Sequence, residues 1–205
     1  EIEIAVSESS VVIKSSNSSF KLQALAANEF PLFDASGSEN FFSVKQKEIK
    51  SLFTKTQFSM AQQDVRFYLN GLLLEISPNT LVSVGTDGHR LSKSKISIEK
   101  TKINETSYIL PRKAVQEVQR IISDQGETKI TFSDNRAIFE IGPTTLVTKL
   151  IDGSFPDYTR VIPKDTSINI VLDVSVIKPA LQRVSILVNE KFKGVRVDLD
   201  DSILN

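Results

Sequence analysis

The sequence predicts an α+β fold in which tandem domains each pack two helices on antiparallel sheets. Most of the chain consists of short apolar or alternating runs separated by Gly, Pro, Asn and Ser, the pattern of antiparallel strands. Two longer stretches carry apolar residues at helical spacing. The order of these elements then recurs along the chain, so the repeating unit is a whole domain.

Apolar runs near the start of the chain predict three strands, at residues 2–6, 11–14 and 20–25. Two further strand runs flank the turn Ser77–Asn79 within residues 66–98. Later strands are expected at residues 108–110, 129–132, 137–141 and 145–150. Turn-forming residues separate these runs, as they do in antiparallel sheets.

The first helix is expected at residues 44–61, because apolar residues recur there at the 3.6-residue period of a helix. These residues are Ile49, Leu52, Phe53 and Met60. Lys47 and Lys50 fall on the opposite face.

The second helix is expected to begin at Pro111, a residue favoured in a first turn, and to run to about Ser123. Its apolar stripe is Val115, Val118, Ile121 and Ile122, and its outer face carries Arg112, Lys113, Gln116 and Arg120. Such a basic face is either simply solvated or binds nucleic acid. Glu117 is its one acidic neighbour, which favours nucleic acid.

The chain also repeats itself. Residues Ile4–Ile13 match Ile130–Phe139, apolar position for apolar position, and Phe20 then falls near Leu146. After Pro163 the middle unit restarts, with a helix expected at residues 173–188 and a strand segment, 192–199, that echoes 68–75; Ile177, Leu181 and Val184 should face inward on that helix. The period is roughly 125 residues, far too long for a solenoid unit.

We therefore expect the end of one domain at residues 1–38, a complete domain at 39–163 and the start of a third at 164–205. The chain opens on Glu1 rather than Met, and an apparent strand start precedes Asn205. It is expected to be cut at both ends.

Composition excludes several classes of site. The chain has no cysteine and one histidine, His89, which excludes disulfides, thiolate metal sites and cysteine catalysis. The 25 basic residues balance the 25 acidic residues, so any nucleic-acid surface must be local. We expect no metal and no cofactor. No apolar run reaches the roughly 18 residues of a membrane span, and no secretory signal opens the chain, so a reducing cytoplasm is the simplest compartment.

The segment Thr86–Leu91 is the most informative motif. Asp87-Gly88 is expected to supply the positive φ angles of a tight hairpin turn, which gathers Thr86, His89, Arg90 and Leu91 at one end of a sheet. Arg66 and Leu69, on the expected partner strand, reach the same corner if the two strands pair antiparallel. This mixture of cation, imidazole and leucine suits a short peptide, and it lacks the nucleophile of a hydrolytic site.

Five motifs in order along the chain resemble the bacterial sliding clamp, the β subunit of DNA polymerase III. They lie at residues 57–71, 86–91, 109–113, 149–158 and 189–196. The resemblance implies the DNA-clamp fold, with three-domain subunits that join head to tail as a homodimeric ring around duplex DNA. It implies a non-catalytic processivity factor that tethers the polymerase, the clamp loader and repair proteins.

The resemblance also implies three groups of site residues. The residues implied to face DNA are Lys47, Lys50, Gln63, Arg112, Lys113 and Arg120. Those implied to line the pocket for partner peptides are Arg66, Leu69, Thr86, Gly88, His89, Arg90, Leu91, Pro156 and Val161. Those implied at the ring interface are Phe20, Leu22, Ile186 and Leu187.

Other interpretations stay open from the sequence. A β-rich hydrolase could use Asp64, Asp87 and His89, provided that they converge in a water-excluded cleft. A structural repeat protein would have no DNA role. His89 could be a turn histidine hydrogen-bonded to backbone, and the interface residues Leu22 and Ile186 could simply be core.

Overall fold

The computed structural model describes residues 1–30, 41–101, 103–133, 135–164, 168–186, 194–200 and 203–204. Contacts divide the chain into two units, Glu1–Pro156 and Asp157–Asn205. The limits expected for the complete domain, 39–163, stay a prediction.

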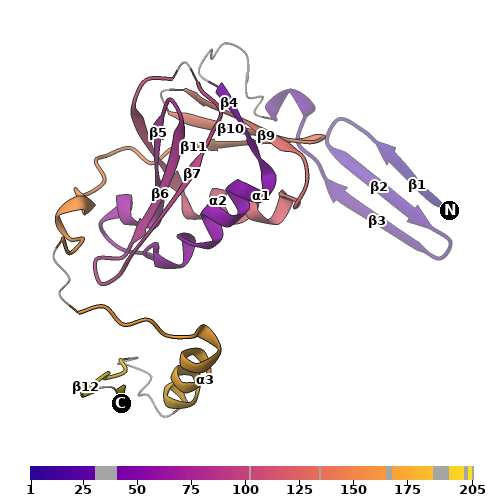
Figure 1. Cartoon of the computed structure of the whole chain (residues 1–205). Coiled ribbons are helices and arrows are strands. Elements are labelled where there is room, and N and C mark those ends of the chain that lie inside the picture. Colours follow the sequence, from indigo (N-terminus) through magenta and orange to yellow (C-terminus); the bar gives the residue numbers. More distant parts are fainter. Residues whose placement is uncertain are drawn as a thin grey trace. The chain divides into compact units, whose positions relative to one another are not determined.

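Two four-stranded antiparallel sheets make up most of the first unit (Figure 1). One has the order β7-β6-β5-β8, with β5 at Gly71–Ser77, β6 at Thr80–Thr86, β7 at Leu91–Ser97 and β8 at Thr106–Pro111. The other has the order β11-β10-β9-β4, with β4 at Phe41–Lys45, β9 at Glu127–Ser133, β10 at Arg136–Ile141 and β11 at Thr144–Lys149. Strand β4 pairs with β9, and β8 pairs with β5, so each sheet combines strands from early and late parts of the sequence.

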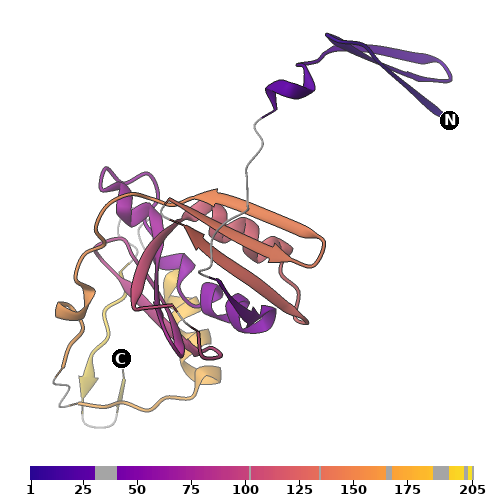
Figure 2. The same cartoon turned by 90° about the horizontal axis from the view of Figure 1, so that it is seen from above.

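Both helices pack against these sheets and against each other (Figure 2). They are α1, Gln46–Thr54, and α2, Arg112–Ile121. Most residues of their apolar stripes are buried as predicted, with Leu52 and Val115 fully inaccessible to solvent, while Ile121 is half-buried. The two sheets share this core, because the rings of Tyr108 on β8 and Phe132 on β9 stack with centroids 4.4 Å apart. The α+β class is confirmed.

The start and end of the first helix were predicted wrongly. Residues Phe41–Lys45 form strand β4, in which Phe42 and Val44 are buried and their neighbours are exposed. That period of two is the signature of a half-buried strand, and α1 begins only at Gln46. The helix ends at Thr54, and Met60 is buried after a separate turn, η2 (Gln57–Ser59).

The second helix is also shorter than predicted. Pro111 closes strand β8 and caps the helix from an extended conformation, so α2 starts at Arg112. It ends at Ile121, and Ile122 returns to an extended conformation.

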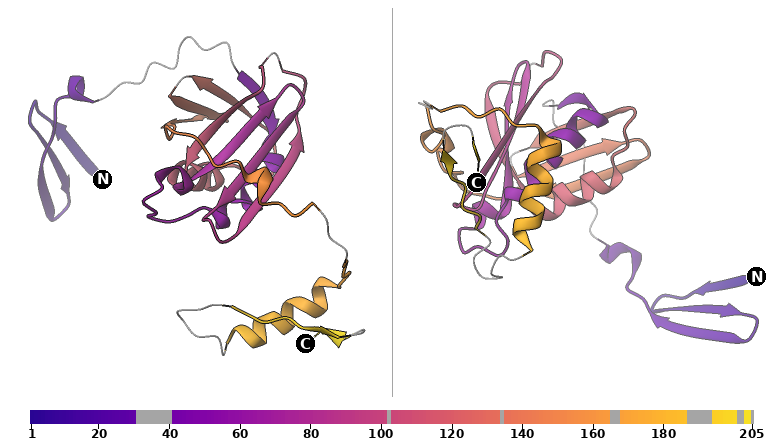
Figure 3. Two further views of the ribbon diagram at one scale, coloured as in Figure 1. Left: turned by 90° about the vertical axis from the view of Figure 1, so that its left-hand side faces the viewer. Right: turned by 60° about the horizontal axis from the view of Figure 1, so that its bottom comes forward.

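The N-terminal residues form a separate three-stranded antiparallel sheet (Figure 3). Its strands are β1 (Ile2–Val6), β2 (Ser10–Ser15) and β3 (Ser18–Gln23), followed by a short helix, η1 (Ala27–Glu29). All three predicted strands are confirmed.

Strand pairing confirms the predicted repeat in register. Ile4 pairs with Ile13 across β1 and β2, as Ile130 pairs with Phe139 across β9 and β10. Ile13 then pairs with Phe20, as Phe139 pairs with Leu146. Repeated sequence positions therefore occupy repeated sheet positions.

The second unit contains η4 (Tyr158–Arg160), α3 (Val174–Ser185), β12 (Leu199–Asp200) and β13 (Ile203–Leu204). Asp173 caps α3 by accepting a hydrogen bond from the backbone of Ser175 at 2.7 Å. The expectation of an inward stripe is wrong for Leu181 and Val184, which are exposed, while Ile177 is half-buried. The predicted helix end at 187–188 lies outside the described residues. Of the predicted strand 192–199, residues 194–198 form no strand.

No helix among the described residues is long and apolar enough to cross a membrane.

Candidate functional site

The turn between β6 and β7 is held by its own side chains. Thr86 Oγ1 donates a hydrogen bond to the carbonyl of Arg90 at 2.7 Å and accepts one from the amide of Gly88 at 3.1 Å. Asp87 Oδ1 accepts from the amides of His89 and Arg90, each at 3.0 Å. These bonds close a four-residue loop whose ends, Thr86 and Leu91, are paired in the sheet. The predicted gathering of Thr86, His89, Arg90 and Leu91 at one end of a sheet is confirmed.

The expected turn geometry is partly wrong. Gly88 has a positive φ of 88°, but Asp87 is not among the residues with positive φ. The loop is longer than a two-residue hairpin, because the carboxylate of Asp87 caps the following amides and holds a wider turn.

Arg66 reaches this turn from a different element than predicted. It lies just before the short helix η3 (Phe67–Asn70), which precedes β5, and not on a strand. Its Nη2 lies 3.4 Å from the carbonyl oxygen of Asp87. A Cβ added to Gly88 would stand 3.2 Å from Nη1 of Arg66, so the arginine packs directly on the turn.

Asp64 fixes the position of Arg66. Its carboxylate accepts from the backbone amide of Arg66 at 2.8 Å, from Nε at 3.0 Å and from Nη2 at 2.8 Å. Asn70 in turn holds the backbone of Asp64 by donating to its carbonyl at 2.8 Å and accepting from its amide at 2.9 Å. Leu69, which is almost fully buried, anchors η3 in the core. We call Thr86–Leu91 together with Arg66 and Leu69 the peptide corner.

The carboxylates of this region are poor proton acceptors. The hydrogen bonds from the side chain and backbone of Arg66 lower the pKa of Asp64 to about 2. Burial raises the pKa of Asp87, but hydrogen bonds from the amides of His89 and Arg90 and from the Arg90 side chain outweigh it and hold that pKa below its ordinary value. Both groups are committed to arginines, so a general base for the hydrolase interpretation is missing from Asp64 and Asp87.

A cavity of about 310 Å³ opens beside the turn. We call it the side cavity, and it is lined by Phe58, Met60, Ala61, Gln62, Asp64, Asp87, His89, Arg90 and Arg112. Within this lining Arg90 contacts Phe58. Its Nη2 donates to the carbonyl of Phe58 at 2.8 Å, and its guanidinium carbon lies 5.8 Å from the centre of the Phe58 ring. Sequence reasoning assigned no role to Phe58, although it belongs to one of the five family-like motifs.

The remaining residues expected in the pocket are less closely placed. Pro156 is exposed at the end of the first unit, and Val161 is exposed in the second unit. Their part in the site stays a prediction. His89 donates a hydrogen bond from its backbone amide to Asp87, and the residue is exposed.

The residues expected to face DNA differ in their surroundings. Lys47, Lys113 and Gln63 are exposed. Lys50 pairs with Asp124 at 2.8 Å, and Arg120 pairs with Glu117 at 2.7 Å, so acidic partners are closer than the sequence suggested. Arg112 donates from Nη1 to the carbonyl of Met60 at 3.2 Å and lines the side cavity.

Of the residues expected at the ring interface, Phe20, Leu22 and Ile186 are exposed, so the core interpretation is wrong for Leu22 and Ile186. Phe20 and Leu22 lie on β3, an edge strand as expected. Leu187 lies outside the described residues.

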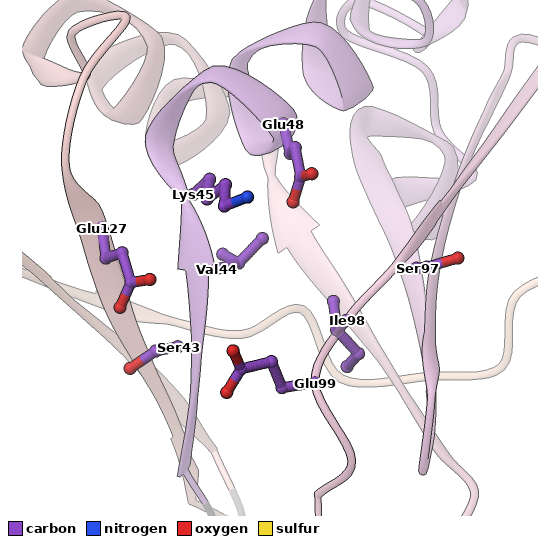
Figure 4. Close-up of a pocket in the computed structure, with 8 residues that line it drawn as sticks. All are labelled: Ser43, Val44, Lys45, Glu48, Ser97, Ile98, Glu99 and Glu127. Carbon is purple, nitrogen blue, oxygen red and sulfur yellow. The ribbon is translucent and has the colours of Figure 1, made fainter.

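A second cavity, of about 270 Å³, lies where β4 and α1 face the end of β7 (Figure 4). Its lining is Ser43, Val44, Lys45, Glu48, Ser97, Ile98, Glu99 and Glu127. Over the described part of the chain, no group of three or more His, Asp or Glu side chains is arranged to hold a metal ion.

Comparison with known proteins identifies what the chain is similar to. Residues 43–157 match the family described as DNA polymerase III beta subunit, central domain. A beta sliding clamp of Pseudomonas aeruginosa is 39% identical over 204 residues, which cover 99% of this chain and 56% of that protein. The beta sliding clamp of Escherichia coli is 38% identical over 206 residues and is likewise covered to 56%.

Solved structures agree with these matches. The crystal structure of the DNA polymerase III subunit beta from Pseudomonas aeruginosa superimposes with a TM-score of 0.90 at 38% identity, covering 99% of this chain and 56% of the other. The crystal structure of the C. crescentus beta sliding clamp gives a TM-score of 0.81 at 32% identity, covering 94% of this chain and 53% of the other. The chain thus spans about half the length of the relatives that it matches.

Proposed function

Because the chain belongs to the family of the DNA polymerase III beta subunit, we propose that its protein is a sliding clamp, a non-catalytic processivity factor that encircles duplex DNA. The observation that carries the proposal is the match over 99% of the chain, joined to a preformed peptide corner at the residues where partner proteins would dock.

The proposed ring is built from three-domain subunits joined head to tail as a homodimer. In this proposal residues 1–38 end the first domain, 39–163 form the second and 164–205 begin the third. Strands β1–β3 and β9–β11 pair in the same register, which supports domains that share one fold. The exposed Phe20 and Leu22 on an edge strand, and Ile186 after α3, support their use between subunits together with Leu187.

The inner surface of the proposed ring meets DNA through α1 and α2. Lys47 and Lys113 are exposed cations. Lys50 and Arg120 form solvent-exposed ion pairs, which are weak and can exchange a carboxylate for a phosphate at little cost. Contacts of this kind are independent of sequence and salt-sensitive, which suits a ring that must slide. Gln63 completes the proposed set, whereas Arg112, also expected to face DNA, lines the side cavity next to the peptide corner.

The peptide corner receives the tethered proteins. A polymerase catalytic subunit, a clamp loader or a repair protein would insert a short linear segment with apolar anchors. Leu91 supplies apolar surface beside the exposed His89 and Arg90, and Thr86 holds the turn that carries them. The family resemblance adds Pro156 and Val161 as further predicted apolar residues of this site. A rigid receptor loses little entropy on binding, so the internal bonds of the turn favour affinity.

A binding titration tests this proposal directly. The resemblance to sliding clamps implies partner peptides of the type Gln-Leu-x-Leu-Phe. Such a peptide, fluorescently labelled, is titrated with the full encoded protein and with its His89→Ala, Leu91→Ala double variant, and polarisation is measured. We expect saturable binding that the double variant weakens by roughly tenfold or more.

Lys95→Ala provides the matched control, because Lys95 is exposed on the same strand, β7, outside the corner. It should bind the peptide as the unchanged protein does. Equal binding by all three proteins would refute the assignment of the peptide site to this corner.

A further inference from the structure

The side cavity joins the peptide corner to the start of α2. It shares Asp87, His89 and Arg90 with the turn and takes Arg112 from the helix. At about 310 Å³ it lies at the small end of the range for ligand pockets. One or two side chains of a bound segment would fill it.

Its charges are unevenly compensated. Asp64 is paired with Arg66 at 2.8 Å and Asp87 with Arg90 at 3.0 Å. Arg112 is half-buried; among the described residues it donates a hydrogen bond to the carbonyl of Met60 and forms no ion pair with a carboxylate. A guanidinium carries five donors, so most of its hydrogen-bonding capacity remains for a ligand.

The helix adds to this excess of positive charge. Arg112 and Lys113 are the first two residues of α2, and its first turn contains no acidic residue. A helix start carries a partial positive charge, so two cations there are unfavourable unless an anion approaches. The excess charge at Arg112 therefore favours a negatively charged group in the side cavity.

We propose that the side cavity is a carboxylate subsite of the peptide corner, in which Arg112 pairs with an acidic side chain that flanks the apolar anchors of a bound peptide. The inference rests on the proposed function, because it extends the same peptide site. Arg90, already stacked near Phe58, forms the wall between the two parts.

The cavity fits a peptide better than a DNA backbone. A sliding duplex needs shallow contacts that release at every step, whereas a recess lined by the aromatic Phe58 and the buried Met60 and Ala61 retains one short segment. A guanidinium also binds a carboxylate through two parallel hydrogen bonds, which gives the contact a defined geometry.

Two peptides test the proposal on the full encoded protein. Both contain the Gln-Leu-x-Leu-Phe core; one carries glutamate on each side of it and the other carries glutamine. The unchanged protein should prefer the glutamate peptide by roughly three- to tenfold, and the preference should shrink at high salt. Arg112→Gln should abolish the preference, whereas Arg112→Lys should retain part of it.

Lys113→Gln is the matched control, since it removes the same charge from the same helical turn outside the cavity lining. It should keep the full preference. A preference that survives in Arg112→Gln, or that Lys113→Gln abolishes equally, would overturn the proposal. So would an Arg112→Gln variant that loses DNA binding but keeps its preference for the glutamate peptide.

The glutamine peptide separates this inference from the underlying function. If it binds and charge makes no difference, only the carboxylate subsite is wrong. If neither peptide binds the unchanged protein, the peptide corner itself is refuted and the subsite with it. Thermal unfolding of each variant checks that the loss of the bond to Met60 has not disturbed the fold.

Discussion

The carboxylate of Asp64 accepts two hydrogen bonds from the side chain of Arg66, from Nε to Oδ1 at 3.0 Å and from Nη2 to Oδ2 at 2.8 Å. These bonds hold the guanidinium against the turn at Gly88. This bidentate geometry is the strongest form of an arginine–carboxylate contact. The turn that presents His89 and Arg90 is therefore supported from a segment more than twenty residues earlier in the chain.

Asp64→Asn should weaken peptide binding without unfolding the protein. The amide keeps the shape of the side chain but loses the charge that holds Arg66, so the turn gains freedom. We expect a loss of affinity of roughly three- to tenfold, measured by fluorescence polarisation. Asp152→Asn, an exposed change of the same kind, should leave the affinity unchanged.

The Asp64–Arg66 ion pair makes the stability of the folded protein depend on pH. The pKa of Asp64 is lowered to about 2 from its ordinary value of 3.8. Because the pKa falls on folding, the stabilisation is fully present above the unfolded value and is lost as the pH falls from about 4 to about 2. Carboxyl chemical shifts followed by NMR across this range should give a midpoint near 2 for Asp64. A midpoint near 4 would show that the ion pair does not form in solution.

Gly88→Ala should damage the peptide corner more than the fold. Gly88 has φ of 88°, and an added Cβ would stand 3.2 Å and 3.3 Å from the two terminal nitrogens of Arg66. The left-handed backbone costs alanine about 1 kcal/mol, and the displaced Arg66 should reduce peptide affinity as well.

Gly142→Ala is the control for backbone strain alone. Its φ is 55°, and an added Cβ would meet no atom within 4 Å. Both variants should lose similar stability in chemical denaturation, but only Gly88→Ala should lose peptide binding. Equal affinity in the two variants would contradict the packing of Arg66 on the turn.

Phe132→Ala should destabilise the first unit by about 3 to 5 kcal/mol. Phe132 is buried between the sheets, where its ring stacks on Tyr108 and lies 6.4 Å from that of Phe42. Phe41→Ala removes the same side chain from a half-exposed position on β4 and should cost well under half as much. Urea denaturation of both variants measures the difference, and equal losses would contradict a shared core at Phe132.

Charge reversal on the two helices should weaken DNA association in the full encoded protein. Lys47→Glu with Lys113→Glu changes one exposed cation on each of α1 and α2. We expect weaker binding and a salt dependence whose slope falls by about two. Lys95→Glu makes one reversal of the same kind on the sheet strand β7 and should have little effect. Unchanged binding by the helix variant would remove α1 and α2 from the DNA-facing surface.

The spacing of apolar residues predicted helices and strands well where a segment carried only one period, either two or about 3.6 residues. The strands β1–β3 and β9–β11 follow from alternating apolar residues, and the buried stripes of α1 and α2 follow from helical spacing. Prediction failed where two patterns met. Val44 suits both a helix and a strand, and pairing of β4 with β9, distant in the sequence, decided for the strand.

Residues of the candidate site were likewise predicted well where local sequence decides their position and poorly where distant segments meet. Residues that are close in sequence, Thr86 to Leu91, were correctly grouped, because a turn brings neighbours together whatever surrounds it. The contacts of Phe58 with Arg90 and of Asp64 with Arg66 were not predicted, since they depend on how a separate segment of the chain packs against the turn.

Local spacing and turn chemistry were enough to predict the class of fold, the repeat and the turn that carries the candidate site. Which partner Arg112 contacts became clear from the folded structure alone. It turned Arg112 toward Met60 and left it without a carboxylate among the described residues, while Arg120 found Glu117 one helical turn away. Glu117 and Arg120 are neighbours on one helix, so their spacing already indicates a pair. The bond of Arg112 to Met60 joins residues 52 positions apart and depends on packing that no linear spacing specifies.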